Sequence, residues 1–201
     1  MRNNREERIG EIHENNVGEQ FIIIDYKNKS NVTVQFMDNY KATMVVDYAN
    51  IRRGSVKNPY SKTVCGVGML GLLPNNTKPV TRVNGKKTKE YIVWCSMLNR
   101  CYSDKYQQNG HTYIDAEVCD RWLIFVNFLE DLPKIDGYEE WINSTENYEY
   151  ALDKDIKGNG SKIYCLENCC FITFGENTKE RNERLGNPFS RENRKNILER
   201  G

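Results

Sequence analysis

The chain of 201 residues contains no long hydrophobic run. No segment approaches the roughly 18 to 20 consecutive apolar residues that a membrane-spanning helix requires. The first eight residues are almost entirely polar, so no secretion signal is expected at this end. The seven cysteines are odd in number and unevenly spaced, which favours reduced thiols over a disulfide framework. These features predict a cytoplasmic protein that does not bind membranes.

Histidine is also scarce: the sequence contains only His13 and His111. Histidine is the side chain that most often transfers protons near neutral pH, so histidine-based catalysis is restricted to these two positions. The sequence has no phosphate-cradling glycine loop and no Ser/His/Asp signature. It therefore does not indicate a P-loop nucleotide site or a serine hydrolase.

Charge is nearly balanced overall, at a formal net charge of +1, but it is unevenly distributed along the chain. Residues 51–110 carry eleven basic and two acidic side chains, whereas residues 111–153 carry two basic and eleven acidic ones. A basic segment can follow a phosphate backbone and release counterions, so DNA is an expected partner. The alternatives are docking of this segment on the acidic one, or a solvated basic surface. The candidate nucleic-acid-binding residues are Arg52, Arg53, Lys86, Lys87, Lys89 and Arg181.

Residues 1–71 are predicted to form a small β-rich module. The apolar run Phe21–Tyr26 and the alternating pattern of residues 32–36 flank a polar segment, which predicts a β-hairpin. Residues 42–48 supply a third β-rich run, and residues 65–71 a glycine-rich turn or last short strand. The module is therefore expected to be a strongly bent sheet or a barrel.

Turn-forming residues and positive charge make residues 72–88 the best candidate for a basic linker. From Thr88, apolar residues recur at three- and four-residue spacings, which predicts an amphipathic helix that ends near Tyr102. A second helix is predicted from residue 119 or 120 to Leu132, where Pro133 would stop it. Its apolar side chains are expected in the core, namely Trp122, Phe125, Phe128, Leu129 and Leu132.

Residues 148–182 predict a strand, a polar loop, a second strand and a helix. Thr173 and Glu176 have the spacing of a capping box, which would start this helix just after the second strand. The sequence thus predicts a ββα unit inside an α+β domain of residues 89–185. The polar tail of residues 186–201 would either dock on a partner or stay mobile.

Several short motifs follow one another in order within residues 91–185. They are Trp94–Tyr102, Val118–Phe125, Leu152–Asp155, Tyr164, Glu167–Cys169, Phe171–Thr173, Asn177 and Asn182. In this order they resemble the HNH nuclease family, in particular the HNH-like proteins of bacteriophages. The resemblance implies an α+β fold, in which the N-terminal β-module precedes a helical segment and an HNH-like ββα-metal unit.

In that family, the ββα unit holds a divalent metal ion against the scissile phosphate, and a histidine at the end of the first strand activates water. By resemblance, Asp153 matches the metal-binding aspartate and Asn168 the central asparagine, while Asn177 is the nearest polar candidate on the final helix. Mg²⁺ suits such oxygen ligands. No zinc site is expected, because the cysteines do not form Cys-x-x-Cys pairs.

Lys154 occupies the position of the family's general-base histidine. Lysine is ordinarily protonated at neutral pH and cannot accept a proton, so Lys154 is expected to contact phosphate instead. Asp155, Tyr164 or His111 would then have to replace the base.

The candidate catalytic residues are accordingly Lys154, Asp153 and Asn168. A structural alternative stays open for two of them. Asp153 can cap a turn, and Asn168 can hold a loop through hydrogen bonds to the backbone.

Two functions follow from these features. The leading hypothesis is a phage-type HNH-like protein that acts on DNA as a Mg²⁺-dependent endonuclease in the host cytosol. The alternative is a non-catalytic phage protein that uses the nuclease scaffold to bind DNA or a host protein and so inhibits host defence or transcription. The near-neutral net charge, the acidic segment of residues 111–153 and Lys154 favour the alternative.

Overall fold

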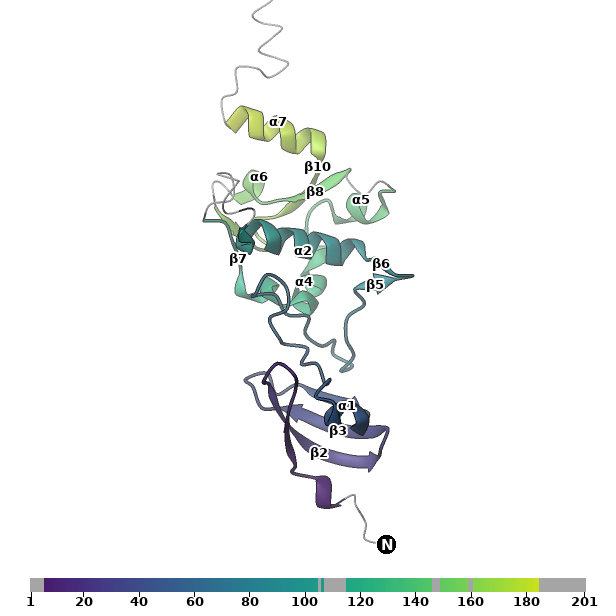
Figure 1. The fold of residues 1–201 in the computed structure, drawn as a ribbon. Helices are drawn as coiled ribbons and strands as arrows, with labels where there is room; N and C mark the ends of the chain where they lie inside the picture. Colours follow the sequence, from purple (N-terminus) through teal and green to yellow (C-terminus); the bar gives the residue numbers. More distant parts are fainter. Residues whose placement is uncertain (1–5, 105, 107–114, 146–148, 159–160, 185–201) are drawn as a thin grey trace, which may run out of the picture. The chain divides into compact units, whose positions relative to one another are not determined.

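The computed structural model describes residues 6–104, 106, 115–145, 149–158 and 161–184. The chain divides into two compact units. Unit 1 comprises Met1–Val80 and Leu123–Val126, and unit 2 comprises Thr81–Trp122 and Asn127–Gly201. The fold is mixed α/β, with an antiparallel sheet followed by helices (Figure 1). The predicted tail of residues 186–201 lies outside the described residues.

Unit 1 contains a four-stranded antiparallel sheet whose strands pair in chain order. They are β1 (Ile12–Glu14), β2 (Gln20–Asn28), β3 (Asn31–Phe36) and β4 (Thr43–Val46). Register shifts interrupt the β2–β3 pairing between Ile23 and Asp25 and again between Tyr26 and Asn28. Such bulges bend a strand and increase its twist. The predicted hairpin and third strand are confirmed, and β1 and β4 form the two edges of a bent sheet rather than closing a barrel.

The core of unit 1 lies on one face of this sheet. Burial alternates along β3, where Val32, Val34 and Phe36 are buried, because successive side chains of a strand point to opposite faces. The short helix α1 (Tyr48–Arg52) covers this face with Ile51, which belongs to the same core cluster. The turn η1 (Glu6–Arg8) precedes the sheet.

The second helix predicted from the sequence is divided in the structure. It consists of the 3₁₀ turn η3 (Asp120–Leu123), the helix α4 (Phe125–Asp131) and the 3₁₀ turn η4 (Leu132–Lys134). The interruption has a tertiary cause. The Met69 N–H donates to the Leu123 carbonyl at 2.9 Å, and the Phe125 N–H donates to the Met69 carbonyl at 2.8 Å. The intervening residue, Ile124, thus forms a β-bridge with Met69, which lies far away in the sequence.

The first predicted helix is confirmed in unit 2. α2 (Lys89–Tyr102) begins after Thr88, whose Oγ1 accepts the Tyr91 N–H at 3.3 Å as an N-cap. Its buried residues include Trp94 and Leu98, as the spacing predicted. The Trp94 indole N–H donates to the Trp122 carbonyl at 2.7 Å and ties α2 to η3.

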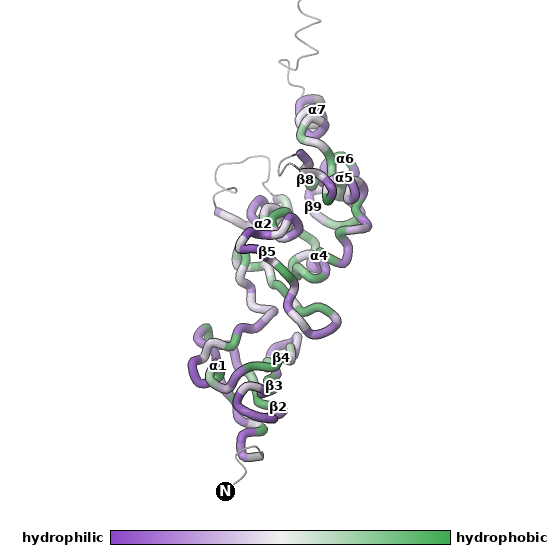
Figure 2. The backbone as a smooth tube through the Cα atoms, turned by 90° about the vertical axis from the view of Figure 1, so that its right-hand side faces the viewer, coloured by the Kyte–Doolittle hydropathy of each residue, from purple (hydrophilic) through white to green (hydrophobic). Residues whose placement is uncertain are grey.

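Strand, strand and helix follow in the predicted order near the end of unit 2. β8 (Tyr150–Asp153) pairs antiparallel with β10 (Cys170–Thr173), and α7 (Phe174–Arg184) starts directly after β10. The predicted capping box is confirmed, because the Thr173 hydroxyl donates to Glu176 Oε2 at 2.8 Å and accepts the Glu176 N–H at 3.3 Å. Figure 2 shows α7 as a mainly hydrophilic helix.

Two further elements lie between β8 and β10. They are the short helix α6 (Asp155–Gly158) and β9 (Ile163–Tyr164), which pairs in parallel with β7 (Glu117–Val118).

The helix α5 (Tyr138–Asn143) packs on β10. The rings of Trp141 and Phe171 stack with centroids 4.3 Å apart. Gly137 precedes α5 with a φ of +79°, and a Cβ atom there would lie 2.3 Å from the Phe171 carbonyl oxygen. Only glycine fits this approach. Among the helices of the described residues, none has both the length and the apolar character needed to cross a membrane.

Candidate nucleic-acid interface

A basic β-hairpin precedes α2 in unit 2 (Figure 1). β5 (Arg82–Val83) and β6 (Lys86–Lys87) pair antiparallel across the Asn84-Gly85 turn. Both turn residues have positive φ angles, 50° and 77°, as a two-residue type I′ turn requires. The Arg82 guanidinium donates to the Gly85 carbonyl at 2.7 Å and closes the turn.

This hairpin was predicted to be part of a linker. The expected linker of residues 72–88 is divided, since its first part, up to Val80, belongs to unit 1 and the hairpin belongs to unit 2. The Asn-Gly pair, which lies between Arg82-Val83 and Lys86-Lys87, is the sequence signal that predicts such a turn. The hairpin was not predicted because strands of two residues are too short to show periodicity in the sequence.

The hairpin carries positive charge, and the nearest acidic residue that follows it in the sequence is Glu90 in the first turn of α2. Arg82, Lys86 and Lys87 are all exposed, and residues 81–89 contain no carboxylate. Lys87 Nζ lies 5.5 Å from the centroid of the Tyr91 ring. A two-stranded ribbon fits the major groove of B-DNA, and its cations can contact phosphates. This arrangement is suited to nucleic acid.

Lys89, two residues further on, has a different role from the phosphate contact predicted for it. Its Nζ donates to the carbonyl oxygens of Trp141 at 3.0 Å, Ile142 at 3.3 Å and Ser144 at 2.5 Å, and to Ser144 Oγ at 3.1 Å. These carbonyls lie at the C-terminal end of α5, where helix carbonyls lack intrahelical partners and a cation is favourable. Lys89 therefore stabilises the end of α5.

The other predicted cations lie elsewhere. Arg52 and Arg53 are exposed at the C-terminal end of α1 in unit 1, where Arg53 Nη2 donates to Asn50 Oδ1 at 2.7 Å. Arg181 belongs to α7, but its side chain is outside the described ones. The basic residues are therefore distributed over both units.

Asp153 ends β8 and caps α6. It is 6% exposed, and its Oδ1 accepts the backbone N–H groups of Asp155 at 2.9 Å and Ile156 at 3.0 Å. A carboxylate in this position satisfies N–H groups that the first turn of a helix leaves without partners. These hydrogen bonds correspond to the structural alternative for Asp153, in which its carboxylate caps a turn.

Lys154 is buried, with 5% of its surface exposed. Its Nζ lies 2.5 Å from Asp155 Oδ1 and 5.7 Å from the centroid of the Tyr164 ring, which is itself buried. An ammonium group held in this way is poorly placed to contact a phosphate backbone. Of the three residues considered as a substitute base, Asp155 pairs with Lys154, Tyr164 is buried, and His111 lies outside the described residues.

Asn168 holds the loop before β10. Its Nδ2 donates to Ser161 Oγ at 2.9 Å and to the Ile163 carbonyl at 3.0 Å. Asn177 is half-buried on α7. Within the described ranges, no three His, Cys, Asp or Glu side chains form a group that could hold a metal ion. The observed hydrogen bonds give Asp153 and Asn168 structural roles, and a magnesium site at these residues stays a prediction.

Cys169 and Cys170 are buried and behave as packing residues, whereas Cys165 in the same region is half-buried. Burial raises the pKa of the Cys165, Cys169 and Cys170 thiols, so they are protonated at neutral pH. All seven cysteines are free thiols. Protonated buried thiols pack as small apolar side chains.

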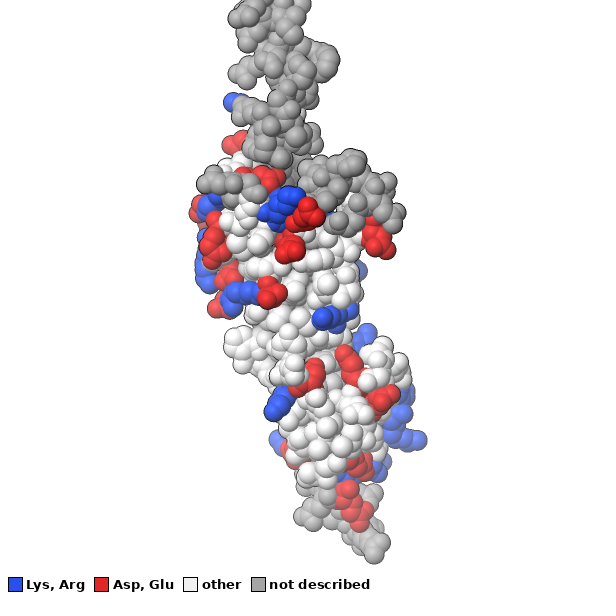
Figure 3. All heavy atoms as spheres, turned by 90° about the vertical axis from the view of Figure 1, so that its left-hand side faces the viewer, with Lys and Arg blue, Asp and Glu red and all other residues white. Residues whose placement is uncertain are grey.

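Charges on one face of unit 2 have mixed sign, with lysine and arginine beside aspartate and glutamate (Figure 3). The acidic segment finds partners within this unit. Asp115 pairs with Lys162 at 3.0 Å, and Asp136 pairs with Lys157 at 2.7 Å. Lys157 and Lys162 lie outside the basic segment of residues 51–110. These two ion pairs therefore do not use the cations of the hairpin, which stay able to contact phosphate.

Comparison with known proteins identifies no relative of this chain. The family models, the curated proteins and the solved structures all give no match. A proposal about function therefore depends on the geometry and charge of the described residues.

Proposed function

We propose that this protein binds DNA and that the β5–β6 hairpin is its principal duplex contact. The observation that carries this proposal is the exposed hairpin with Arg82, Lys86 and Lys87 in a segment free of carboxylates. Phosphate contacts of this kind supply sequence-independent affinity, and a ribbon of two strands can enter the major groove.

The surroundings of Lys154 favour binding over cleavage. The position that holds a histidine in the HNH family here holds a buried ammonium paired with Asp155, while Asp153 caps α6. Neither group is positioned as a proton acceptor for water. In this proposal the β8, β10 and α7 elements serve as a scaffold.

Removing the two lysines of the hairpin is expected to weaken duplex binding. Lys86→Gln/Lys87→Gln should raise the Kd roughly tenfold near 0.1 M salt and make the negative slope of log K against log salt shallower by about 2, because two phosphate contacts are lost. Fluorescence anisotropy of a labelled duplex across a salt series measures both quantities. Arg82 is retained because it closes the turn.

The matched control is Lys57→Gln/Lys62→Gln, which removes two exposed lysines from unit 1. This control should leave the salt slope nearly unchanged. Equal slopes for the wild type and the hairpin variant would contradict the proposal. A wild-type protein that fails to bind duplex even at low salt would redirect the search to a host protein as partner.

A metal-dependent endonuclease is the second candidate. It is favoured by the order of β8, β10 and α7, with Asp153 at the end of β8 opposite Cys170. Under the binding proposal, supercoiled plasmid should stay intact with Mg²⁺ or Mn²⁺.

Asp153→Asn separates the two candidates, because asparagine keeps an oxygen that can cap α6 but removes the charge. Nicking by the wild type that is lost in this variant and in EDTA would establish the nuclease. Asp153→Ala, which removes the cap as well, controls for effects that arise from stability alone.

A further inference from the structure

A second basic site lies in unit 1, separate from the hairpin. A pocket of about 730 Å³ opens between η1, the β2–β3 turn and α1. Its lining includes five basic side chains and one carboxylate, that of Asp47. The basic residues are Arg8, Lys27, Lys29, Arg52 and Arg53.

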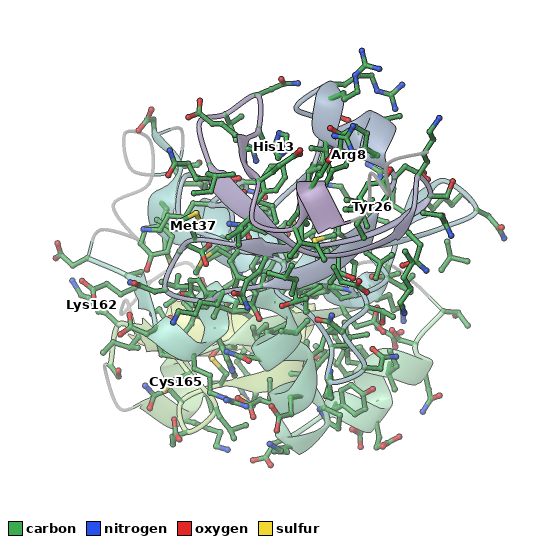
Figure 4. The ribbon with its side chains drawn as sticks, turned by 90° about the horizontal axis from the view of Figure 1, so that it is seen from below. Arg8, His13, Tyr26, Met37, Lys162 and Cys165 are labelled. Atoms are coloured by element: carbon green, nitrogen blue, oxygen red, sulfur yellow. The ribbon has the colours of Figure 1, made fainter. Side chains whose placement is uncertain are left out.

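A backbone hydrogen bond and ring contacts connect the elements that line this pocket. The Tyr48 N–H donates to the Lys29 carbonyl at 2.8 Å, which places the β2–β3 turn beside the start of α1. The Arg8 guanidinium carbon lies 4.2 Å from the centroid of the Tyr48 ring, and Arg8 also hydrogen-bonds the Tyr48 hydroxyl. The Tyr26 ring contacts Tyr48 edge-on, with centroids 5.8 Å apart (Figure 4 labels Arg8 and Tyr26). The Arg8 side chain and the backbone of the β2–β3 turn are therefore held in place at this pocket.

The positive charge of this pocket is poorly neutralised. Arg8 lies 3.5 Å from Glu11, which offsets part of its charge. The ion pairs found in the described part of the chain include none for Lys27, Lys29 or Arg52. Cations that converge on a pocket in this way raise the local concentration of anions.

We infer that this pocket binds the phosphate groups of single-stranded nucleic acid. The small size of the pocket and the flexibility of the ligand favour a single strand. A duplex has a persistence length of about 50 nm, so it is too stiff to bend around a pocket of about 730 Å³. A single strand can bend its phosphates into the pocket, towards Lys29 and Arg52. The inference rests on the proposed nucleic-acid role but uses a different unit and a different form of nucleic acid.

The test compares a labelled single-stranded oligonucleotide with a labelled duplex of the same sequence by fluorescence anisotropy. Lys29→Gln/Arg52→Gln should raise the Kd for the single strand at least tenfold and leave duplex binding within twofold of the wild type. Lys57→Gln/Lys62→Gln, which removes two cations elsewhere in unit 1, should affect neither. Inorganic phosphate, compared with chloride at equal ionic strength, tests whether free phosphate competes.

Several results would overturn the inference. One is an equal Kd for the single strand in the wild type and in Lys29→Gln/Arg52→Gln. Another is an equal loss of single-strand affinity in this variant and in the control Lys57→Gln/Lys62→Gln. Binding of inorganic phosphate in calorimetry, with no binding of the oligonucleotide in the anisotropy assay, would make the pocket a free-phosphate site. If Lys86→Gln/Lys87→Gln still weakens duplex binding in these cases, the proposed function survives. If the wild type binds neither form of DNA, both proposals fail.

Discussion

Replacing Asp131 by alanine is expected to lower the free energy of unfolding of unit 2 by about 3 kcal/mol, since two exposed cations and one buried indole lose their common buried acceptor. Asp131 is 3% exposed. Its carboxylate accepts hydrogen bonds from Arg121 Nε at 2.7 Å, Lys134 Nζ at 2.8 Å and the Trp122 indole N–H at 3.1 Å. Trp122 is fully buried, so its indole N–H would be left without a partner.

The measurement is urea unfolding followed by tryptophan fluorescence. All three tryptophans, Trp94, Trp122 and Trp141, belong to unit 2, so this signal reports on that unit. Glu130→Ala is the matched control, because Glu130 also pairs with Arg121, at 2.8 Å, but is exposed. The control should cost less than about 1 kcal/mol, as surface ion pairs do. Equal losses in the two variants would contradict the assignment.

The same carboxylate should make unit 2 sensitive to acid. Burial alone would raise the pKa of Asp131, but hydrogen bonds from Arg121, Lys134 and Trp122 outweigh it and lower the pKa from 3.8 to about 2. Because the folded pKa is depressed, the stabilisation is fully present above the unfolded pKa and is lost as the pH falls through the folded one. Between pH 5 and pH 2, the wild type should lose about 2 kcal/mol more than Asp131→Asn. Parallel pH profiles for the two proteins would rule out this role.

Replacing Asp155 by asparagine is expected to destabilise unit 2 by about 3 kcal/mol, because the buried Lys154 ammonium loses its charged partner. The side chain of Lys154 is 7% exposed, whereas that of Asp155 is 25% exposed. Lys154→Met removes the buried charge but keeps a long apolar side chain, and it leaves the carboxylate partly in water. It should therefore cost less, about 1 kcal/mol.

The stabilities of Asp155→Asn and Lys154→Met, together with the duplex affinity of Lys154→Met, test whether Lys154 stabilises unit 2 or contacts DNA. Urea unfolding by tryptophan fluorescence gives the stabilities, and duplex anisotropy gives the affinities. Lys154→Met should leave the Kd for duplex DNA within twofold of the wild type. A large loss of affinity at unchanged stability would instead place Lys154 in the DNA contact and return it to the role that the sequence predicted.

The sequence by itself determined features that depend on neighbouring residues. The start of α2 after Thr88 and the capping box of Thr173 and Glu176 follow from hydrogen bonds between residues three positions apart. The hairpin of β2 and β3 follows from alternation that lets one face of the sheet be buried. These signals are local, so a single sequence contains them.

Only the tertiary structure decided the features that join distant residues. The break at Ile124 depends on Met69, and the role of Lys89 depends on the end of α5. The burial of Lys154 likewise depends on how β8 and its surroundings pack, which residue type alone does not reveal. For Ile124 and Lys89 the partner lies many residues away in the sequence, and for Lys154 the distant Tyr164 ring lies near the ammonium that Asp155 pairs with. Residue type identified Lys89 and Lys154 as basic, and the folded chain determined that one faces a helix end and the other a carboxylate.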